Sequence, residues 1–264
     1  MRIEFIGTGN AHGTPTPGCG CTVCREAQIN LERRRRAPCI ALSTADNSAA
    51  VVIDAGDPAI NNWLERPQTA AVLLSHFHPG HFHALLAHRR SNGQTRLLCP
   101  PDRSGIETVT QSSRAFEIEE LSPYNAIDLG PFRITPVLLN HNVITYGYCV
   151  EGDGQRLAYL CDTCGLPPQT TQHLHEWKPD ALIIDCNQHP RSRKPTHNTP
   201  QDALAIHRST GASRSLLTHI SCRVDAWLHP RPKSFPKNFD VARDGMVVDL
   251  ASSPPNKSSK NAFA

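Results

Sequence analysis

Three histidines lie within six residues of the sequence, directly after a run of apolar residues. The motif is His76-x-His78-x-Gly80-His81, and residues 70–74 before it predict a buried strand. Histidines at positions i and i+2 point the same way in an extended segment, so they can bind one ion together, whereas they cannot share a helix face. The third imidazole can then reach a neighbouring ion. The alternative is a histidine-rich surface loop, since a chain with 14 histidines has some clusters by chance.

Three further residues with metal-binding side chains each follow a predicted strand: His141, Asp162 and His219. A single histidine after a strand is usually structural. Three ligand-type residues at successive strand ends, downstream of a His-x-His motif, instead favour a shared site. Five histidines and one aspartate in this order can hold two first-row metal ions that share the carboxylate.

Three cysteines lie within another six residues, as Cys19-Gly20-Cys21-Thr22-Val23-Cys24. Thiolates at this spacing can surround one side of a tetrahedral ion, and the glycine eases the tight turn. A closed structural zinc site needs a fourth ligand and leaves no open position for catalysis. The alternative is three unrelated reduced thiols. The chain has 10 cysteines but no export signal, so we expect reduced thiols and metal ligation in place of disulfides.

Length and charge limit the class of protein. The 264 residues suit one large domain, residues 1–250, followed by a polar, Pro/Ser-rich tail at 251–264 that we expect to be disordered. The net charge of +3 is modest and predicts no nucleic-acid partner. The run Glu32 to Arg36 fits the solvated side of a short helix, with phosphate attraction as the alternative. No segment predicts a signal peptide or a membrane span, so a cytoplasmic protein with no membrane partner is expected.

The pattern of apolar residues predicts an α/β chain with two sheets and helices outside them. Strands are predicted at the N-terminus and at 39–43, 48–54, 70–74, 96–99, 132–139, 146–151, 156–161, 181–185, 215–218 and 246–250. Helices are predicted at 25–36, 58–65, 169–176 and 201–209, and directly after the histidine motif.

Two segments near the N-terminus have more than one interpretation. The turn-rich loop 7–18 is not a nucleotide-binding fingerprint, because no amphipathic helix begins at its last glycine, and its backbone can instead come close to a site. Asp54 ends a predicted strand and precedes Ala55-Gly56. It either caps the loop or orients a ligand imidazole through the second ring nitrogen.

The histidine and aspartate set resembles the metal motif of the metallo-β-lactamase superfamily in order and spacing. Further matches are Gly18-Cys19-x-Cys21-x-x-Cys24, Asp185-Cys186 and Asp225-Ala226-Trp227, which make the chain similar to phosphodiesterases of the PhnP family up to about residue 250. The resemblance implies an αββα sandwich in a single domain with a zinc-knuckle loop.

The same resemblance implies an activity and assigns roles. The activity is hydrolysis of 5-phosphoribosyl 1,2-cyclic phosphate to ribose 1,5-bisphosphate, in phosphonate catabolism by the carbon-phosphorus lyase pathway, usually with Mn²⁺. One ion would be held by His76, His78, His141 and Asp162. The other would be held by His81, Asp162 and His219. Cys222 would complete the structural Zn²⁺ site of Cys19, Cys21 and Cys24, and His197 would be the catalytic general acid beside Asp162.

Gly80 departs from the superfamily motif, which has an aspartate ligand of the second ion at this position. Its loss is expected to weaken the second site, and most of all for Mn²⁺, which prefers carboxylate oxygens. Four alternatives stay open. They are a single-ion enzyme, a second metal site that fills only with substrate, another phosphodiester hydrolase and a metal-depleted non-catalytic relative. If the site is intact, Gly80→Asp is expected to raise second-ion affinity. The expected partner is a small cyclic sugar phosphate, and a homodimer stays open.

Overall fold

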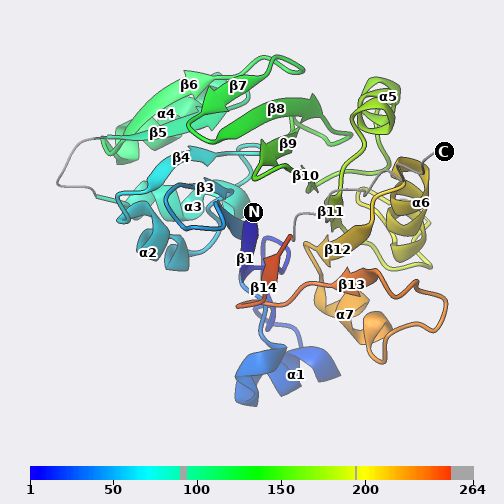
Figure 1. Cartoon of the computed structure of the whole chain (residues 1–264). Coiled ribbons are helices and arrows are strands. Elements are labelled where there is room, and N and C mark those ends of the chain that lie inside the picture. The colour runs from blue at the N-terminus through cyan, green and yellow to red at the C-terminus, as the bar shows by residue number, and fades with distance from the viewer. Residues whose placement is uncertain (90–93, 194, 251–264) are drawn as a thin grey trace, which may run out of the picture.

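Two seven-stranded sheets lie at the centre of the computed structural model, which describes residues 1–89, 94–193 and 195–250 (Figure 1). The first sheet has the order β14-β1-β2-β3-β4-β5-β6, and its strands from β3 to β6 are parallel. Its strands are β1 (Arg2–Gly7), β2 (Cys39–Ser43), β3 (Ala50–Ile53), β4 (Thr69–Leu73), β5 (Thr95–Cys99), β6 (Phe116–Glu120) and β14 (Val247–Asp249).

The second sheet has the order β13-β12-β11-β10-β9-β8-β7, and it is parallel from β10 to β13. Its strands are β7 (Ile127–Leu129), β8 (Phe132–Leu138), β9 (Tyr146–Gly152), β10 (Gln155–Leu160), β11 (Ala181–Asp185), β12 (Arg214–Thr218) and β13 (Phe239–Val241). Parallel neighbours end at the same edge of a sheet, so the residues that follow β10, β11 and β12 meet there.

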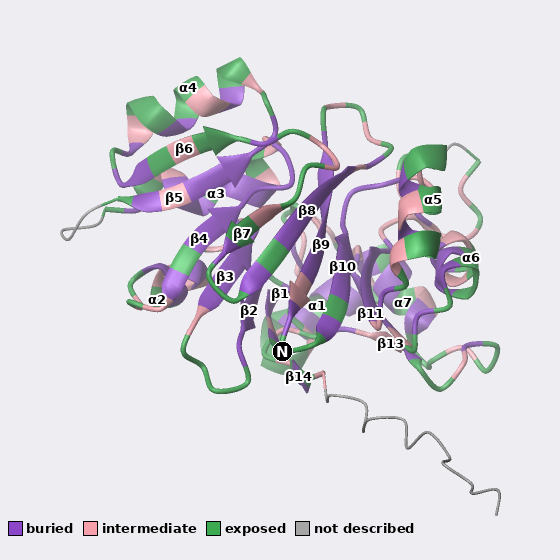
Figure 2. Cartoon of the chain, turned by 45° about the horizontal axis from the view of Figure 1, so that its top comes forward, coloured by how far each residue is buried: buried purple, intermediate pink, exposed green. Residues whose placement is uncertain are grey.

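Three clusters of buried apolar side chains separate four layers. One cluster joins the inner faces of the two sheets, and the other two lie between each sheet and its own helices. Figure 2 shows buried strands, with exposed residues on the outer sides of α4 and α5. The helices are α1 (Thr22–Ile29), α2 (Asn61–Leu64), α3 (Pro79–Ala87), α4 (Arg103–Ser112), α5 (Pro168–Trp177), α6 (Pro200–Thr210) and α7 (Cys222–Leu228), with 3-10 turns η1 (Leu31–Arg33) and η2 (Pro58–Ile60). The predicted αββα arrangement is confirmed.

Local sequence explains where the predicted helices begin and end. Helix α6 starts with a capping box, in which the Thr199 and Asp202 side chains each accept a hydrogen bond from the other residue's backbone. Pro200 occupies its first turn, and Gly211 ends it in a left-handed conformation with φ 68°. The strands predicted from apolar runs are present within a few residues of the expected bounds.

The prediction of a helix over 25–36 is wrong at both ends. Helix α1 begins at Thr22, because the Cys21 side chain accepts a hydrogen bond from the Cys24 backbone and caps it. The helix ends at Ile29. The run Glu32 to Arg36 is solvated only in part. Arg34 and Arg36 are exposed, whereas Arg35 is 6% exposed and its Nη2 lies 2.9 Å from Oδ1 of Asp225.

Several elements were not predicted. Helix α4 and strands β6, β7 and β13 are short or carry few apolar residues, and α7 has only 7 residues. The tail expected to be disordered, 251–264, lies outside the described residues. Within the described ranges, no helix is long and apolar enough to cross a membrane.

Arg35 provides a test of this packing. Its Nη1 also donates to the Thr8 hydroxyl (2.8 Å) and to the Ala242 carbonyl (2.7 Å). We expect Arg35→Ala to lower the free energy of unfolding by about 3–5 kcal/mol, because Asp225 is left buried and unpaired. Arg36→Ala is the matched control, with a side chain 54% exposed, and should cost less than about 1 kcal/mol. Urea denaturation measures both, and similar losses would contradict the buried ion pair.

Candidate metal centre

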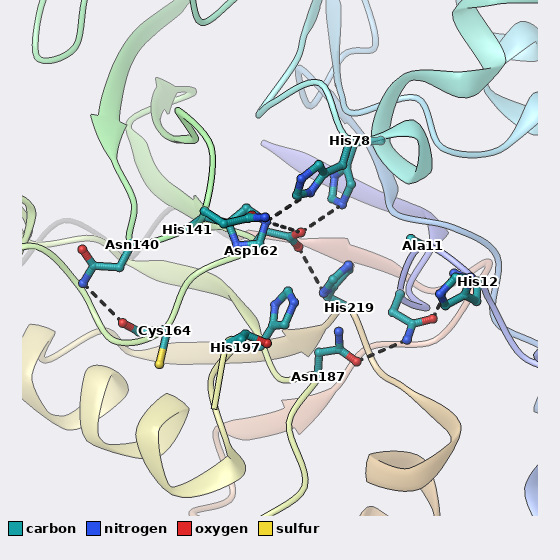
Figure 3. Close-up of a pocket in the computed structure, with 14 residues that line it drawn as sticks. Ala11, His12, His78, Asn140, His141, Asp162, Cys164, Asn187, His197 and His219 are labelled. Atoms are coloured by element: carbon teal, nitrogen blue, oxygen red, sulfur yellow. Dashed lines mark hydrogen bonds and ion pairs between the residues drawn. The ribbon is translucent and has the colours of Figure 1, made fainter. Parts of the chain in front are cut away.

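The structure brings the six predicted ligands together at one edge of the two sheets (Figure 3). His76 and His78 follow β4 of the first sheet. The other ligands come from α3 and from loops after β8, β10 and β12. Two hydrogen bonds between the sheets hold the histidine loop: Tyr146 N donates to Ser75 O (2.9 Å), and the Tyr148 hydroxyl donates to Leu74 O (2.6 Å).

The first ligand set is His76, His78, His141 and Asp162. Each offers one ligand atom, and these atoms all lie within 4.8 Å of one another. Burial is the main cause that lowers the pKa of His76 and His78, and it lowers that of His141 to about 4. Burial would raise the pKa of Asp162, but His219 and His81 hold it well below its usual value. Three neutral imidazoles and one carboxylate are the ionisation states that a metal ion binds.

The predicted second ligand set is His81, His219 and the shared Asp162. The ligand atoms that lie within 4.8 Å of one another at this place belong instead to Asp162, Asp185, His197 and His219, and His81 groups with Asp54 and Cys161. Nε2 of His81 lies 3.4 Å from Oδ2 of Asp162, and Nδ1 of His219 lies 3.0 Å from Oδ1. Burial would lower the pKa of His81, but Asp162 and Asp54 outweigh it and raise the pKa to about 10. The carboxylates of Asp54 and Asp162 thus flank the two nitrogens of the His81 ring.

Asp54 lies directly behind His81, as one of its two interpretations predicts. Its Oδ2 is 2.9 Å from Nδ1 of His81 and also accepts the Tyr159 hydroxyl at 2.8 Å. Its Oδ1 accepts the Ser75 backbone N–H at 2.9 Å. These bonds fix the orientation of the His81 ring and leave Nε2 for the centre.

Unpaired nitrogen atoms test whether the residues fit a cation. The Nε2 atoms of His76, His81 and His219 are buried and have no hydrogen-bond partner among the described residues. Buried polar atoms are nearly always paired, so three unpaired nitrogens at one centre indicate a missing ligand. Because they surround an ionised carboxylate, the group that fits is a metal cation.

Three residues of the centre have a strained backbone. Asp54, Asp162 and His219 adopt left-handed conformations, with φ of 62°, 61° and 58°. Each such non-glycine residue costs about 1–3 kcal/mol, and such residues concentrate at functional sites. Each lies just after a strand, where the chain must turn sharply to aim a side chain along the sheet edge.

Asp185 is a site residue that the sequence reasoning missed. Its Oδ2 lies 2.8 Å from Nδ1 of His197, and its Oδ1 lies 3.3 Å from Nδ1 of His219. Burial would lower the pKa of His197, but the carboxylate of Asp185 outweighs it and raises that pKa. A usable signal was present, because Asp185 ends the strand between those that deliver Asp162 and His219.

A cavity of about 590 Å³ opens in front of the centre. Asparagine amides from three loops surround it, namely Asn10, Asn140, Asn142 and Asn187. His197 also lines it, with its ring centroid 5.4 Å from that of His141 and 5.1 Å from that of His219. The loop after β1 contributes Ala11 and His12, so its backbone does come close to the site.

Gly80 packs against that loop. A Cβ atom at residue 80 would lie 2.6 Å from Cα of Ala11 and closer still to its Cβ. A backbone hydrogen bond of 2.8 Å from Gly9 to Arg36 helps to hold the loop. The geometry contradicts the expectation that Gly80→Asp simply restores a ligand, because backbone occupies the place of the aspartate side chain.

The four predicted knuckle cysteines meet about the start of α7. Cys19, Cys21, Cys24 and Cys222 each offer a sulfur atom, and these atoms all lie within 4.8 Å of one another. Hydrogen bonds from Cys21 are the main cause that lowers the pKa of Cys19 to about 7. A Cys₄ cluster of this kind fits a structural zinc ion.

The contact between Gly80 and Ala11 can be tested by substitution. We expect Gly80→Ala and Gly80→Asp each to lower the free energy of unfolding by about 1–3 kcal/mol through overpacking. Gly80→Asp should bind no additional ion, as measured by elemental analysis after dialysis. His83→Ala, at an exposed position of α3, is the control and should change neither stability nor metal content. If the Gly80→Asp protein keeps full stability and retains an extra ion, the loop after β1 can move away from residue 80. That result would contradict the prediction.

The sequence and the fold are similar to those of known proteins. The profile of the beta-lactamase superfamily domain matches residues 50–220. A comparison with curated proteins finds no match.

Among solved structures, a new diphosphatase from the PhnP family is 22% identical with a TM-score of 0.76, covering 95% of this chain and 98% of its own. Zn²⁺-bound PqqB from Methylobacterium extorquens is 17% identical with a TM-score of 0.73, and the match covers 95% of this chain and 100% of that structure. The short form of human tRNase Z is 18% identical with a TM-score of 0.69, and the match covers 96% of this chain and 100% of that structure. These likenesses concern the fold. The chain therefore belongs to the metallo-β-lactamase superfamily and is a metal-dependent hydrolase.

Proposed function

We propose that this hydrolase is a phosphodiesterase that converts 5-phosphoribosyl 1,2-cyclic phosphate to ribose 1,5-bisphosphate, as a step of phosphonate catabolism. The observation that carries the proposal is the hydrogen-bonded pair of Asp185 and His197, whose ligand-type atoms group with those of Asp162 and His219. A diester of a sugar needs a proton donor at the leaving oxygen, and this pair places one at the wall of the cavity.

The residues divide the chemistry between them. When bound, metal ions lower the pKa of water and neutralise charge on phosphoryl oxygens. The Asp185 carboxylate accepts the hydrogen bond from Nδ1 of His197, which leaves Nε2 as the nitrogen that can face a substrate. His197 then protonates the departing ribose oxygen, since an alkoxide is a poor leaving group. The amides of Asn140 and Asn187 can bind sugar hydroxyl groups.

The donor set bears on the identity of the catalytic metal. Five imidazoles and one carboxylate suit Zn²⁺ better than Mn²⁺, which prefers oxygen ligands. The absence of a carboxylate at residue 80 strengthens this preference for zinc. Zinc at the centre is therefore our proposal, and the Mn²⁺ expected from the resemblance is the weaker fit.

A second candidate activity is hydrolysis of a diphosphate. The PhnP-family structure of similar fold is a diphosphatase. This likeness in fold makes diphosphate hydrolysis the second candidate activity for this chain. The two reactions differ in the group that leaves, because a phosphate leaving group does not need the proton that a ribose alkoxide needs. The role of His197 therefore separates the two activities.

The first test is turnover with metal analysis. We expect the purified protein with zinc to convert the cyclic ribose phosphate to ribose 1,5-bisphosphate, followed by phosphorus NMR. Elemental analysis should show at least one zinc ion beyond that of the Cys₄ cluster. One zinc ion per chain with no turnover would instead indicate a non-catalytic relative.

The second test concerns the general acid. We expect His197→Ala to lower kcat on the cyclic ribose phosphate by about a hundredfold or more, because proton transfer contributes roughly 10²–10⁴-fold. The loss on bis(p-nitrophenyl) phosphate should be much smaller, since its leaving group needs no proton. His83→Ala, an exposed position on α3, is the control. Equal losses on both substrates would contradict the acid role.

A further inference from the structure

The catalytic cavity leaves one part of the proposed substrate without a charged partner. Among the described residues that line the cavity, none is lysine or arginine. The cyclic diester can be bound at the metal centre, but the 5-phosphate carries up to two further negative charges. Phosphate groups in proteins are usually bound by arginine, lysine or several N–H donors. Any lysine or arginine that binds the 5-phosphate therefore lies outside this cavity.

A second cavity of about 550 Å³ adjoins the first at Asn187, which lines both. It lies between the Cys₄ cluster, the loop 187–192 and the start of α7. Arg191 and Arg223 line it, and none of its described lining residues is acidic. We call it the arginine cavity.

Both arginines are available to a ligand. Neither guanidinium forms an ion pair among the described residues, and both side chains belong to exposed residues. The loop that carries Arg191 is held in place, because the Ser221 hydroxyl donates to Asn187 O (2.9 Å) and Gln188 Nε2 donates to the Ser192 hydroxyl (2.6 Å). The same Ser221 precedes α7, on which Arg223 lies. The two charges are thus presented by segments that are bonded to each other.

A third cavity, of about 590 Å³, touches the catalytic cavity at Ala11 and His12 but is a poorer anion site. It contains three arginines, yet the carboxylates of Asp57 and Asp244 also line it. Arg35 is paired with Asp225, and Nε of Arg34 donates to Ala27 O at 2.9 Å. The positive charge of this third cavity is therefore already neutralised by carboxylates or held in hydrogen bonds to backbone carbonyls.

We propose that Arg191 and Arg223 bind the terminal phosphate of a sugar phosphate whose cyclic diester lies at the metal centre. Asn187 stands at the junction, with its Oδ1 accepting from Asn10 Nδ2 (3.3 Å) and its amide nitrogen pointing towards His219 in Figure 3. A substrate that extends past Asn187 thus meets metal ligands at one end and arginines at the other. This inference rests on the proposed phosphodiesterase activity and assigns the residues that bind the terminal phosphate of its substrate.

The experiment compares two substrates that differ by one phosphate: the 5-phosphorylated cyclic ribose phosphate and the same compound with a free 5-hydroxyl. Zinc-loaded wild-type protein should have the higher kcat/KM on the phosphorylated compound. Arg191→Gln and Arg223→Gln should each raise KM for it by about tenfold or more, since a hydrogen bond to a charged group is worth roughly 1.5–3 kcal/mol. Neither substitution should change kcat/KM on the 5-hydroxyl compound.

Arg36→Gln, in the third cavity, is the matched control and should leave both substrates unaffected. Equal wild-type kcat/KM on the two compounds, or losses that are the same for both in the arginine variants, would overturn the proposal while leaving the phosphodiesterase intact. If wild type hydrolyses neither compound, the proposed function fails, and binding of ribose 5-phosphate by calorimetry decides the site. In the calorimetry, a loss of affinity for ribose 5-phosphate in Arg191→Gln and Arg223→Gln but not in Arg36→Gln supports the arginine cavity as the phosphate site. Unchanged affinity in Arg191→Gln and Arg223→Gln overturns it.

Discussion

A buried negative charge is the constraint on which the rest of the structure depends. Asp162 is only 3% exposed, and two more carboxylates, Asp54 and Asp185, are fully buried within the same centre. Burying a carboxylate costs several kcal/mol unless cations or hydrogen-bond donors compensate it. Imidazoles alternate with the three carboxylates, as His81 lies between Asp54 and Asp162, and His219 between Asp162 and Asp185. The fold must therefore hold this alternation firmly, and a metal ion completes its charge balance.

The two sheets share the task of holding the centre. The histidine loop belongs to the first sheet, but it is bonded to β9 of the second through Tyr146 and Tyr148. Tyr159 likewise donates from the second sheet to Asp54 of the first. These cross-sheet bonds mean that neither sheet presents a complete centre alone. They also explain how strained residues persist at the strand ends, because contacts from both sheets determine their conformation.

Much of the fold and part of the centre could be predicted from the sequence. Apolar runs identify most strands, and ligand-type residues directly after them are visible without any structure, which is why His141, Asp162 and His219 could be placed beside His76. Other features depend on which loops meet. The burial of Arg35 requires Asp225, which is distant in sequence, and the contact of Gly80 with Ala11 requires the fold of the loop after β1. Neither leaves a periodic pattern in the sequence, so local reasoning cannot find them.

The Cys₄ cluster has a consequence for how the protein is made. Cys19 and Cys222 are 203 residues apart, so the ribosome adds the last sulfur donor roughly 10–40 seconds after the first, at about 5–20 residues per second. During that interval three thiolates are in place without their fourth partner, and a zinc ion that binds them keeps an exchangeable position. Only when α7 emerges can the ion be enclosed. Enclosure of a zinc ion at the knuckle would thus be a late event of biogenesis, and it would join the beginning of the chain to its last quarter.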